Sequence, residues 1–399
     1  MKCLYVLIIM IFATIPAWAI NRTIEVRKGE SLQTAIDISI SGDTIKIGEG
    51  EFRALPAIYN DDRCGNCNDQ NIPVKATRGF IVEGKSLVII GASPFQTKLI
   101  TNAGYGVLFI NSDGSSISNL TITGGKRDTS GNATDAGIVV KNSIVHIKNI
   151  HVKDNTDQAP GVVVGIAGII GREGSEIIVE KSIIRNNSWD GVALYRGAKA
   201  LIIDNMLEQG RGVGIGVTWN AHATILRNSV SYYWKGIGTF GNAEAIVKNN
   251  AVYENLSWGI AVTGSSFIEA ANNVVARNGN CGVAIWDSTS SAKIYNNVIT
   301  ENGWRDEWLC PQVGFWMNGK MTNVEFTYND VWNNVMGNYR NIEDQTGING
   351  NISAEPLFLQ DSNYKTLPTS PLRKAGNPNV RKLDRNSNHI GIEGGPAAQ

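Results

Sequence analysis

Hydrophobic and polar residues alternate in short runs through the middle of this chain, and the runs recur at an almost constant spacing. A four-residue motif begins at five positions, 22 or 23 residues apart: Gly191, Gly214, Gly236, Gly259 and Gly282. The glycine is followed by an apolar residue, a small residue and a fourth residue that is apolar in four of the five copies. A second series keeps nearly the same step, 22 to 24 residues: Asn205, Asn228, Asn250, Asn273 and Asn297. Two independent series with one period indicate a single structural unit repeated along the chain.

A repeat of this length, built from short alternating runs, is typical of one coil of a parallel β-helix. Because side chains in a strand point alternately to its two faces, one residue after each glycine belongs to an inward apolar row: Val192, Ile215, Ile237, Ile260 and Val283. The asparagines are expected in turns, with their amides hydrogen-bonded from coil to coil. A leucine-rich repeat has a similar period but needs several leucines and a helix in each unit. The sequence therefore predicts an all-β solenoid.

The first 19 residues have the pattern of an export signal peptide. Lys2 precedes an apolar run from Leu4 to Thr14, and Ala17 and Ala19 are the small residues of a cleavage site. The run is too short to be a membrane span. We therefore expect a secreted protein, extracellular or periplasmic, and we expect it to be a monomer.

Basic and acidic residues balance, with 36 of each in the whole chain. A near-neutral protein exerts no long-range attraction on nucleic acid or on an anionic membrane. Recognition of a charged partner must therefore come from a local group of residues.

Four cysteines follow the signal segment, and they predict two disulfides in an oxidising compartment. Cys64 and Cys67 are close in the sequence, and the alternative, a zinc site, lacks a second Cys or His pair nearby. Cys281 opens one coil, and Cys310 lies in an insertion before the equivalent strand of the next coil. Because adjacent coils are about 4.8 Å apart, this second pair is geometrically plausible.

The two ends of the chain carry motifs of their own. Residues 20–85 are expected to form an N-terminal cap, with a short helix at 31–37, followed by the loop that carries the first cysteine pair. Residues 86–336 are expected to form the coils, and residues 337–399 the last coil end and an irregular C-terminal cover. The opening motif is Ser31-Leu-Gln-Thr-Ala-Ile, and the closing one is His389-Ile-Gly-Ile-Glu-Gly-Gly.

These end motifs and the coils resemble the secreted pectate-lyase-like right-handed parallel β-helix repeat proteins. The resemblance implies a right-handed parallel β-helix and a polysaccharide as partner. That group contains lyases, epimerases and hydrolases, so the resemblance does not define the chemistry. The Arg-x-Pro-x-x-Arg pattern of pectate lyases and the Asp-Pro-His-Glu signature of mannuronan epimerases are both missing here.

The outward row of the repeated strand is the candidate binding surface. Counted from the motif glycine, the third residue of each strand is mostly Gly or Ala, and these small residues would make a floor. Aromatic and charged residues at the neighbouring positions would form the walls. Aromatic faces suit the apolar faces of sugar rings, so an extended glycan is expected along this face. The alternative is that the aromatic side chains merely cover the solenoid. The predicted substrate-binding residues are Trp219, Phe240, Trp286, Trp316, Asp190 and Asp287.

Candidate catalytic residues lie near the ends of the same strands. Arg196, Arg211 and Lys235 belong to three adjacent coils, hence roughly 5 to 10 Å apart along the axis, and could hold a uronate carboxylate. Lys235 or Arg211 is the candidate base for β-elimination, and Tyr195 or Tyr233 the candidate proton donor.

Two further possibilities concern carboxylates. A glycoside hydrolase needs two carboxyl groups about 5 to 9.5 Å apart, whereas Asp190 and Asp287 are four coils apart, roughly 19 Å. Ca²⁺ is a possible cofactor, and Asp61, Asp62 and Asp69 could supply oxygen ligands, although a solvated loop held by the disulfide explains them as well.

Taken together, the candidate residues and the resemblance lead us to expect a polysaccharide lyase acting on an acidic glycan. The alternative is a non-catalytic carbohydrate-binding or cell-envelope solenoid.

Overall fold

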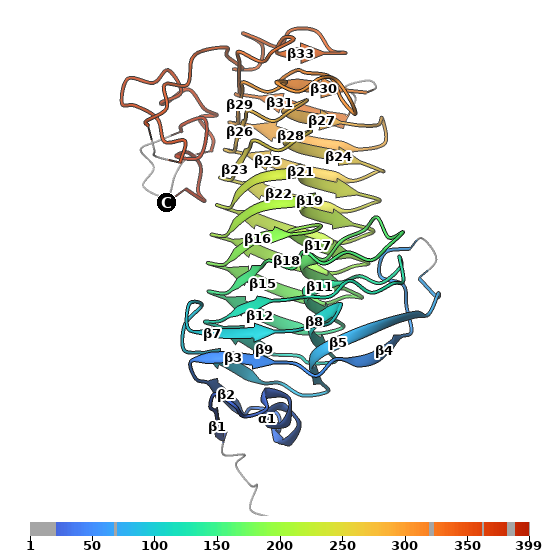
Figure 1. Ribbon diagram of the computed structural model, residues 1–399. Coiled ribbons are helices and arrows are strands. Elements are labelled where there is room, and N and C mark those ends of the chain that lie inside the picture. The colour runs from blue at the N-terminus through green and yellow to red at the C-terminus, as the bar shows by residue number, and fades with distance from the viewer. Residues whose placement is uncertain (1–20, 68–69, 319–322, 361–362, 381–387, 399) are drawn as a thin grey trace, which may run out of the picture.

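Parallel coils stacked along one axis make up most of the molecule (Figure 1). The computed structural model describes residues 21–67, 70–318, 323–360, 363–380 and 388–398. The predicted signal peptide, residues 1–19, lies outside the described residues. The one helix of the described part, α1 (Leu32–Ile38), is too short to cross a bilayer.

Each coil contributes strands to three faces, here called the first, second and third sheets. The first sheet consists, in order, of β1 (Thr23–Val26), β2 (Thr44–Ile47), β6 (Val88–Gly91), β9 (Ser115–Ser118), β12 (Ile144–Lys148), β15 (Glu176–Glu180), β18 (Lys199–Ile203), β20 (His222–Leu226), β22 (Glu244–Lys248), β25 (Phe267–Ala271), β28 (Ser291–Tyr295) and β31 (Val324–Thr327). The second sheet consists of β3 (Gly50–Arg53), β7 (Thr97–Ile100), β10 (Thr121–Thr123), β13 (His151–Lys153), β16 (Ile183–Asn187), the first parts of β19 (Met206–Thr218) and β21 (Ser229–Phe240), β23 (Ala251–Tyr253), β26 (Val274–Ala276), β29 (Val298–Thr300) and β32 (Asp330–Trp332).

The third sheet carries the candidate binding surface. It consists of β5 (Val74–Glu83), β8 (Tyr105–Ile110), β11 (Ala136–Lys141), β14 (Ala167–Arg172), β17 (Val192–Tyr195), the second parts of β19 and β21, β24 (Ile260–Thr263), β27 (Val283–Ile285), β30 (Phe315–Met317) and β33 (Tyr339–Arg340). All these pairings are parallel; β4 (Ala57–Asp61) joins β5 in an antiparallel hairpin. The right-handed parallel β-helix predicted from the sequence is confirmed.

Helix α1 covers the first coil, as expected. Ser31 is its N-cap, because the Ser31 side chain accepts a hydrogen bond from the Thr34 N–H (3.2 Å). Leu32, Ala35 and Ile36 are buried on the face that packs on the core. The helix therefore shields the apolar end that a solenoid would otherwise expose.

The predicted apolar row lies inside the solenoid. Val192 pairs with Ile215, Ile215 with Ile237, and the series continues through Ile260 to Val283. All five side chains are at most 2% exposed. Because the same strand position recurs in every coil, alternate residues are held on the outer face in equally regular rows.

Buried asparagines connect successive coils in the turn between the first and second sheets. The side-chain amide of Asn250 donates to Asn273 Oδ1 (3.0 Å) and to the carbonyl of Ile225 (2.9 Å), while its own Oδ1 accepts from Asn228. This predicted series is confirmed and continues to Asn329 and Asn351.

A second asparagine series, which the sequence analysis missed, lies five residues after the first. It comprises Asn255, Asn278, Asn302 and Asn334, whose amides are linked in the same way between the second and third sheets. The signal was present in the sequence, because each member follows a member of the first series at a constant distance.

The C-terminal segment lies along the outside of the second sheet (Figure 1). Leu372 and Ile390 pack on Val274 and Val298. The Asn249 side chain donates to the carbonyls of Ile392 (2.8 Å) and Gly394 (2.7 Å), and other coils make similar contacts. The expected cover therefore exists, and it shields a side of the solenoid.

We predict that Asn250→Ala destabilises the fold by about 2–4 kcal/mol. Several buried partners of the amide would lose their hydrogen bond at once, and each such loss costs about 1–3 kcal/mol. Chemical denaturation with intact disulfides measures the effect. The matched control is Asn60→Ala, since Asn60 is exposed in β4; equal midpoints for the two variants would contradict a structural role for the series.

A pH dependence is predicted from Asp330, which is fully buried in β32. Its Oδ1 accepts from the Ala354 N–H (2.9 Å), and its Oδ2 has no hydrogen-bond partner in the described part of the chain. Burial raises the pKa of Asp330 to about 7, against about 4 in an unfolded chain. Between about pH 4 and pH 7 the folded state holds a proton that the unfolded state releases, so stability falls as pH rises through this window.

Asp330→Asn should remove this loss. Its stability relative to the wild type should rise by about 2–4 kcal/mol between pH 4 and pH 8, measured from denaturation midpoints across that range. Asp37→Asn is the control, since Asp37 is exposed on α1. A difference that does not change with pH would show that Asp330 is already ionised in the folded protein.

Candidate functional site

The outer face of the third sheet has a row of small residues whose two ends run beneath covered regions. The floor follows the predicted third position: Ala193, Gly216, Gly238, Ala261 and Ala284 are aligned by the strand pairing. Toward the N-terminus, the β4–β5 hairpin and the loop with Cys64 and Cys67 cover the face. Toward the C-terminus, the insertion around Cys310 covers it.

Both predicted disulfides are present. The Cα atoms of Cys64 and Cys67 are 5.5 Å apart, and those of Cys281 and Cys310 are 6.0 Å apart. The second bridge ties the insertion to a coil of the solenoid, so the covered region at that end is held covalently.

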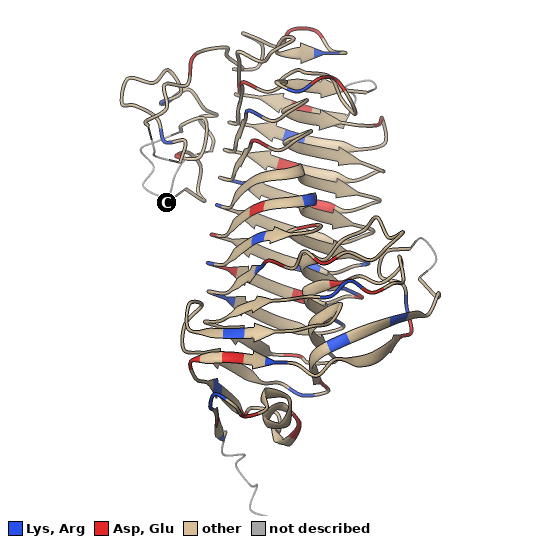
Figure 2. Ribbon diagram, viewed as in Figure 1, with Lys and Arg blue, Asp and Glu red and all other residues tan. Residues whose placement is uncertain are grey.

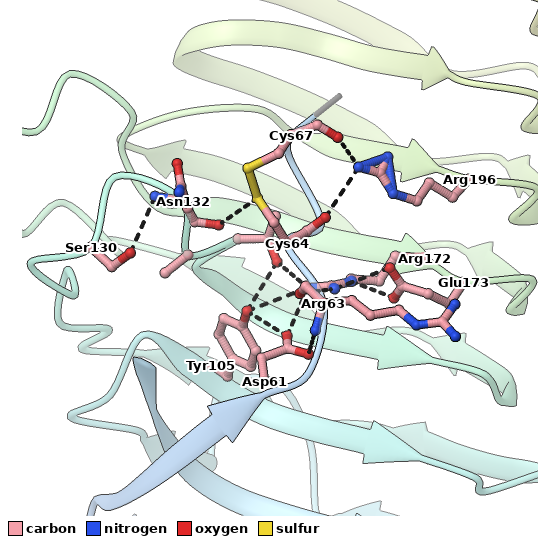
Figure 3. Close-up of a disulfide and its surroundings, with 12 residues drawn as sticks. Asp61, Arg63, Cys64, Cys67, Tyr105, Ser130, Asn132, Arg172, Glu173 and Arg196 are labelled. Atoms are coloured by element: carbon pink, nitrogen blue, oxygen red, sulfur yellow. Dashed lines mark hydrogen bonds and ion pairs between the residues drawn. A yellow bond between two sulfur atoms is a disulfide. The ribbon is translucent and has the colours of Figure 1, made fainter. Parts of the chain in front are cut away.

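The loop of the first disulfide is held by buried charges (Figure 3). The Arg172 guanidinium, with no exposed side-chain area, contacts Asp61 Oδ2 (2.9 Å) and the carbonyl of Arg63 (2.7 Å). Lys141 pairs with both Asp61 and Asp62. These carboxylates are already matched by cations, so they do not fit the predicted Ca²⁺ site; Asp69, its third member, lies outside the described residues.

Arg196 does not join the predicted cationic patch. It follows β17, at the opposite end of the strand from Arg211 and Lys235, and its guanidinium donates to the carbonyls of Cys64 (3.1 Å) and Cys67. It also stacks on Trp219, 4.5 Å from the ring centroid. Arg196 therefore anchors the disulfide loop, and Figure 3 shows it reaching toward that loop.

Lys235 lies in an aromatic surrounding. Its Nζ is 4.6 Å from the centroid of the Trp234 ring and 4.7 Å from that of Trp258. Burial lowers the pKa of Lys235, and the nearby Asp190 carboxylate opposes this shift. Indole faces favour a cation electrostatically, so the ammonium group is held here without an ion pair within 4 Å among the described residues.

Asp190 is buried beside a β-bulge in β19. Arg211 and Gly212 together stand opposite the single residue Trp234, and the Val213 N–H donates to Asp190 Oδ1 (2.7 Å). A side chain at Gly212 would overlap that same oxygen. Burial raises the pKa of Asp190 to about 6. The bulge therefore makes room for the carboxylate, and bulges often orient side chains next to active sites.

The two tyrosines predicted as proton donors have different positions. The Tyr195 hydroxyl donates to Asp190 Oδ2 (3.5 Å), and the residue is 8% exposed at the sheet surface. Tyr233 is wholly buried among core residues, and its hydroxyl donates to the carbonyl of Ile184. That prediction is corrected: Tyr233 cannot contact a bound glycan, because its ring fills the space above Gly210 and Gly191, where a Cβ would clash.

The exposed side chain of Arg211 stands in the bulge opposite Trp234. Trp234 directly precedes Lys235, so Arg211 and Lys235 lie at the same end of the third sheet. Arg196, the third predicted cation, lies at the other end.

The predicted aromatic residues form two groups on the third sheet. Trp219 packs with Tyr195 (5.7 Å between centroids), while Trp286 packs edge-to-face with Trp258 (5.3 Å) and Trp316 (4.9 Å). Phe240 lies partly buried over Gly238 and contacts the second group. The rings cover the solenoid, but Trp219, Phe240 and Trp286 keep some exposed surface, whereas Trp316 is only 9% exposed.

Asp287 is a structural residue. One carboxylate oxygen accepts from Thr263 Oγ1 (3.0 Å) and the Gly264 N–H (2.6 Å), and the other from Thr289 and Ser290. These hydrogen bonds lower the pKa of Asp287 against the opposing effect of burial. Its predicted role in substrate binding is therefore corrected, because its acceptor positions are occupied within the chain.

The insertion supplies a residue that the sequence analysis missed. Trp308 stacks on Trp234 at 5.0 Å with an interplanar angle of 14°, beside Lys235. Insertions are aperiodic, so no repeat pattern pointed to this contact.

Charged residues of both signs are interspersed along the coils (Figure 2). Within the described ranges, no three His, Cys, Asp or Glu side chains are grouped closely enough to hold a metal ion. The local electrostatics of the site therefore come mainly from Lys235, Arg211 and the buried Asp190.

Comparison with known proteins identifies the fold. A family model described as the right-handed β-helix region matches residues 65–230 and 167–331. The A-module of the Azotobacter vinelandii mannuronan C-5 epimerase AlgE4 is 14% identical, with a TM-score of 0.55, covering 78% of this chain and 92% of that one. The AlgE6 A-module from the same organism is 16% identical, with a TM-score of 0.51 and coverage of 81% and 94%. Pectate lyase Pel9A is 13% identical, with a TM-score of 0.52 and coverage of 93% and 96%. No curated protein matches the sequence.

We predict that Gly212→Ala destabilises the protein by about 1–3 kcal/mol, as overpacking usually does, because the new Cβ would meet the Asp190 carboxylate. Gly216→Ala is the matched control in the same strand, since a Cβ there would find its nearest neighbour at 3.8 Å. Thermal denaturation compares the two. Equal stabilities would mean that the bulge adapts and does not hold Asp190 rigidly.

Proposed function

The chain belongs to the right-handed β-helix family, and from this premise we propose that it acts on a polysaccharide bound along the outer face of the third sheet. The similar structures include mannuronan C-5 epimerases and a pectate lyase, and mannuronan and pectate are both polymers of uronic acids. This likeness supports an acidic glycan as the substrate class. The export pattern of residues 1–19 and the two disulfides support an extracellular or periplasmic site of action.

The observation that carries the proposal is Lys235 in its aromatic surrounding. A lysine is a useful base only when it is neutral. Burial lowers the pKa of Lys235 in that direction, against the Asp190 carboxylate and the indole faces of Trp234 and Trp258, which favour the charged form. A uronate carboxylate needs a cation near the reacting carbon. The exposed Arg211 stands at the same end of the sheet and is the proposed cation.

The proposed reaction is β-elimination. Neutral Lys235 takes the proton from the carbon next to the uronate carboxylate, and that C–H electron pair becomes a C=C double bond. The bond from the adjacent carbon to the glycosidic oxygen breaks, and this oxygen receives a proton. Tyr195 is the proposed donor, because burial and the neighbouring Asp190 raise its pKa and so keep its hydroxyl protonated in the free protein.

The aromatic groups favour a second function, a non-catalytic glycan-binding or cell-envelope solenoid. Tryptophan rings at the surface of the third sheet would bind sugar rings whether or not a bond is broken. The two functions differ in one requirement, since cleavage needs Lys235 as a base, whereas binding needs only the rings and the Gly/Ala floor.

We predict that incubation with polygalacturonate or alginate, with and without Ca²⁺, produces the ultraviolet absorbance of unsaturated sugar ends. Lys235→Ala should lower this rate by at least about 100-fold, the usual contribution of a general base. Lys199→Ala is the control, because Lys199 is exposed on the first sheet and pairs with Glu176.

Two results would change the proposal. Full activity of Lys235→Ala would show that another group is the base. If no uronate polymer yields unsaturated ends but binding is present and weakens in Trp286→Ala or Trp219→Ala, the protein is a binding module.

A further inference from the structure

A cavity of about 490 Å³ lies on the ridge of turns between the second and third sheets, apart from the Lys235 site. It is lined by Tyr232, Glu254, Leu256, Arg277, Glu301 and Trp304. Its volume is within the usual range of small-ligand pockets. The Tyr232, Leu256 and Trp304 side chains are 48%, 42% and 51% exposed, so apolar surface faces solvent next to charged groups.

The lining residues come from successive coils and are aligned by the repeat. Tyr232, Glu254, Arg277 and Glu301 all have positive φ angles between 51° and 57° and occupy the same turn position. Adjacent coils are about 4.8 Å apart, so the four side chains form one row with the Arg277 cation between two carboxylates. Arg277 is 3.3 Å from Glu254 and 3.7 Å from Glu301.

Both aromatic rings are held in place although they are exposed. The Trp304 indole N–H donates to the Arg277 carbonyl (2.7 Å). Tyr232 forms a side-chain hydrogen bond with Glu254, which raises the pKa of Tyr232 to about 12. Arg277 is in turn fixed by the Tyr364 hydroxyl of the C-terminal cover (2.7 Å). The pocket is therefore preorganised, which reduces the entropy cost of binding a ligand.

From these contacts we propose that the pocket is a second carbohydrate site, which binds neutral hexopyranose residues. Ring faces and Leu256 suit the C–H faces of a sugar, and the carboxylate and guanidinium groups at its edge can bond sugar hydroxyls. Two acidic groups and one basic group line the pocket, and Arg305, whose guanidinium donates to the Leu256 carbonyl (3.3 Å), lies beside them, so the site has no net positive charge to attract a uronate carboxylate. This preference is opposite to that expected of the groove with Lys235 and Arg211.

The same insertion borders both sites. Trp304 lines the pocket, whereas Trp308, four residues later, stacks on Trp234 beside Lys235. A sugar in the pocket and a glycan in the groove would therefore lie on two sides of residues 304–308. The pocket proposal does not depend on catalysis, since it requires only binding.

The test is isothermal titration calorimetry of the full mature chain with cellohexaose, mannohexaose and maltohexaose, and with a hexagalacturonate as the acidic comparison. The wild type should bind at least one neutral oligosaccharide. Trp304→Ala and Tyr232→Ala should each raise its Kd at least 10-fold, and Trp304→Phe should restore part of the affinity. Phe95→Ala is the control, because Phe95 is 88% exposed and lies outside the pocket.

Circular dichroism and binding of polygalacturonate in the groove would show that the variants are folded. The proposal is overturned if no neutral hexasaccharide binds the wild type, or if Trp304→Ala binds it as tightly as Phe95→Ala does. It is also overturned if hexagalacturonate is the ligand that depends on Trp304. Loss of uronate cleavage in Lys235→Ala with unchanged neutral-sugar binding would separate this site from the proposed lyase site.

Discussion

Stacking of buried asparagine amides from coil to coil is the interaction on which the rest of the structure depends. Each amide carries donors and an acceptor that are costly to bury without partners. In the series around Asn250 these groups are satisfied only when the neighbouring coil presents its own asparagine at the same height. A shift by one residue would break these bonds and also turn the inward apolar row outward. The asparagine series therefore sets the register of the coils from Asn205 onward.

A fixed register has a direct consequence for function. It aligns one outward position of each coil in a row, so contacts between neighbouring coils alone extend a Gly/Ala floor and aromatic side chains along the third sheet. Beyond the asparagine positions, the connecting segments are under no such constraint, and there the loop of Cys64 and the insertion of Cys310 depart from the repeat. Binding residues commonly lie on loops placed by a rigid scaffold, and here both disulfides hold such loops at the edges of the face.

The Lys235 and Asp190 environments show how the scaffold adjusts charge. Burial raises the pKa of the carboxyl to about 6 and lowers that of the ammonium. Each charge opposes the shift of the other, but desolvation is the larger effect, so each group is held closer to neutrality than it would be on an open surface. The bulge at Gly212 and the rings of Trp234 and Trp258 are the local means by which this desolvation is achieved. Such perturbed groups on a binding face are typical of functional sites.

The sequence alone determined the solenoid, its inward row, the first asparagine series and the pairing of the cysteines. Those features recur at a fixed period or follow from spacing, and a period in the sequence is directly a distance along the axis. It also placed Tyr195, Trp286 and Trp316 on one face, because side chains alternate in a strand, and it placed Lys235 just before one of the same strands. Only the tertiary structure decided that Arg196 binds the disulfide loop, that Tyr233 fills the core and that the Asp287 carboxylate accepts hydrogen bonds from the adjacent turns. It also revealed Trp308 on Trp234, since the path of an aperiodic loop and the direction of a side chain at a turn or bulge depend on packing partners that no repeat encodes.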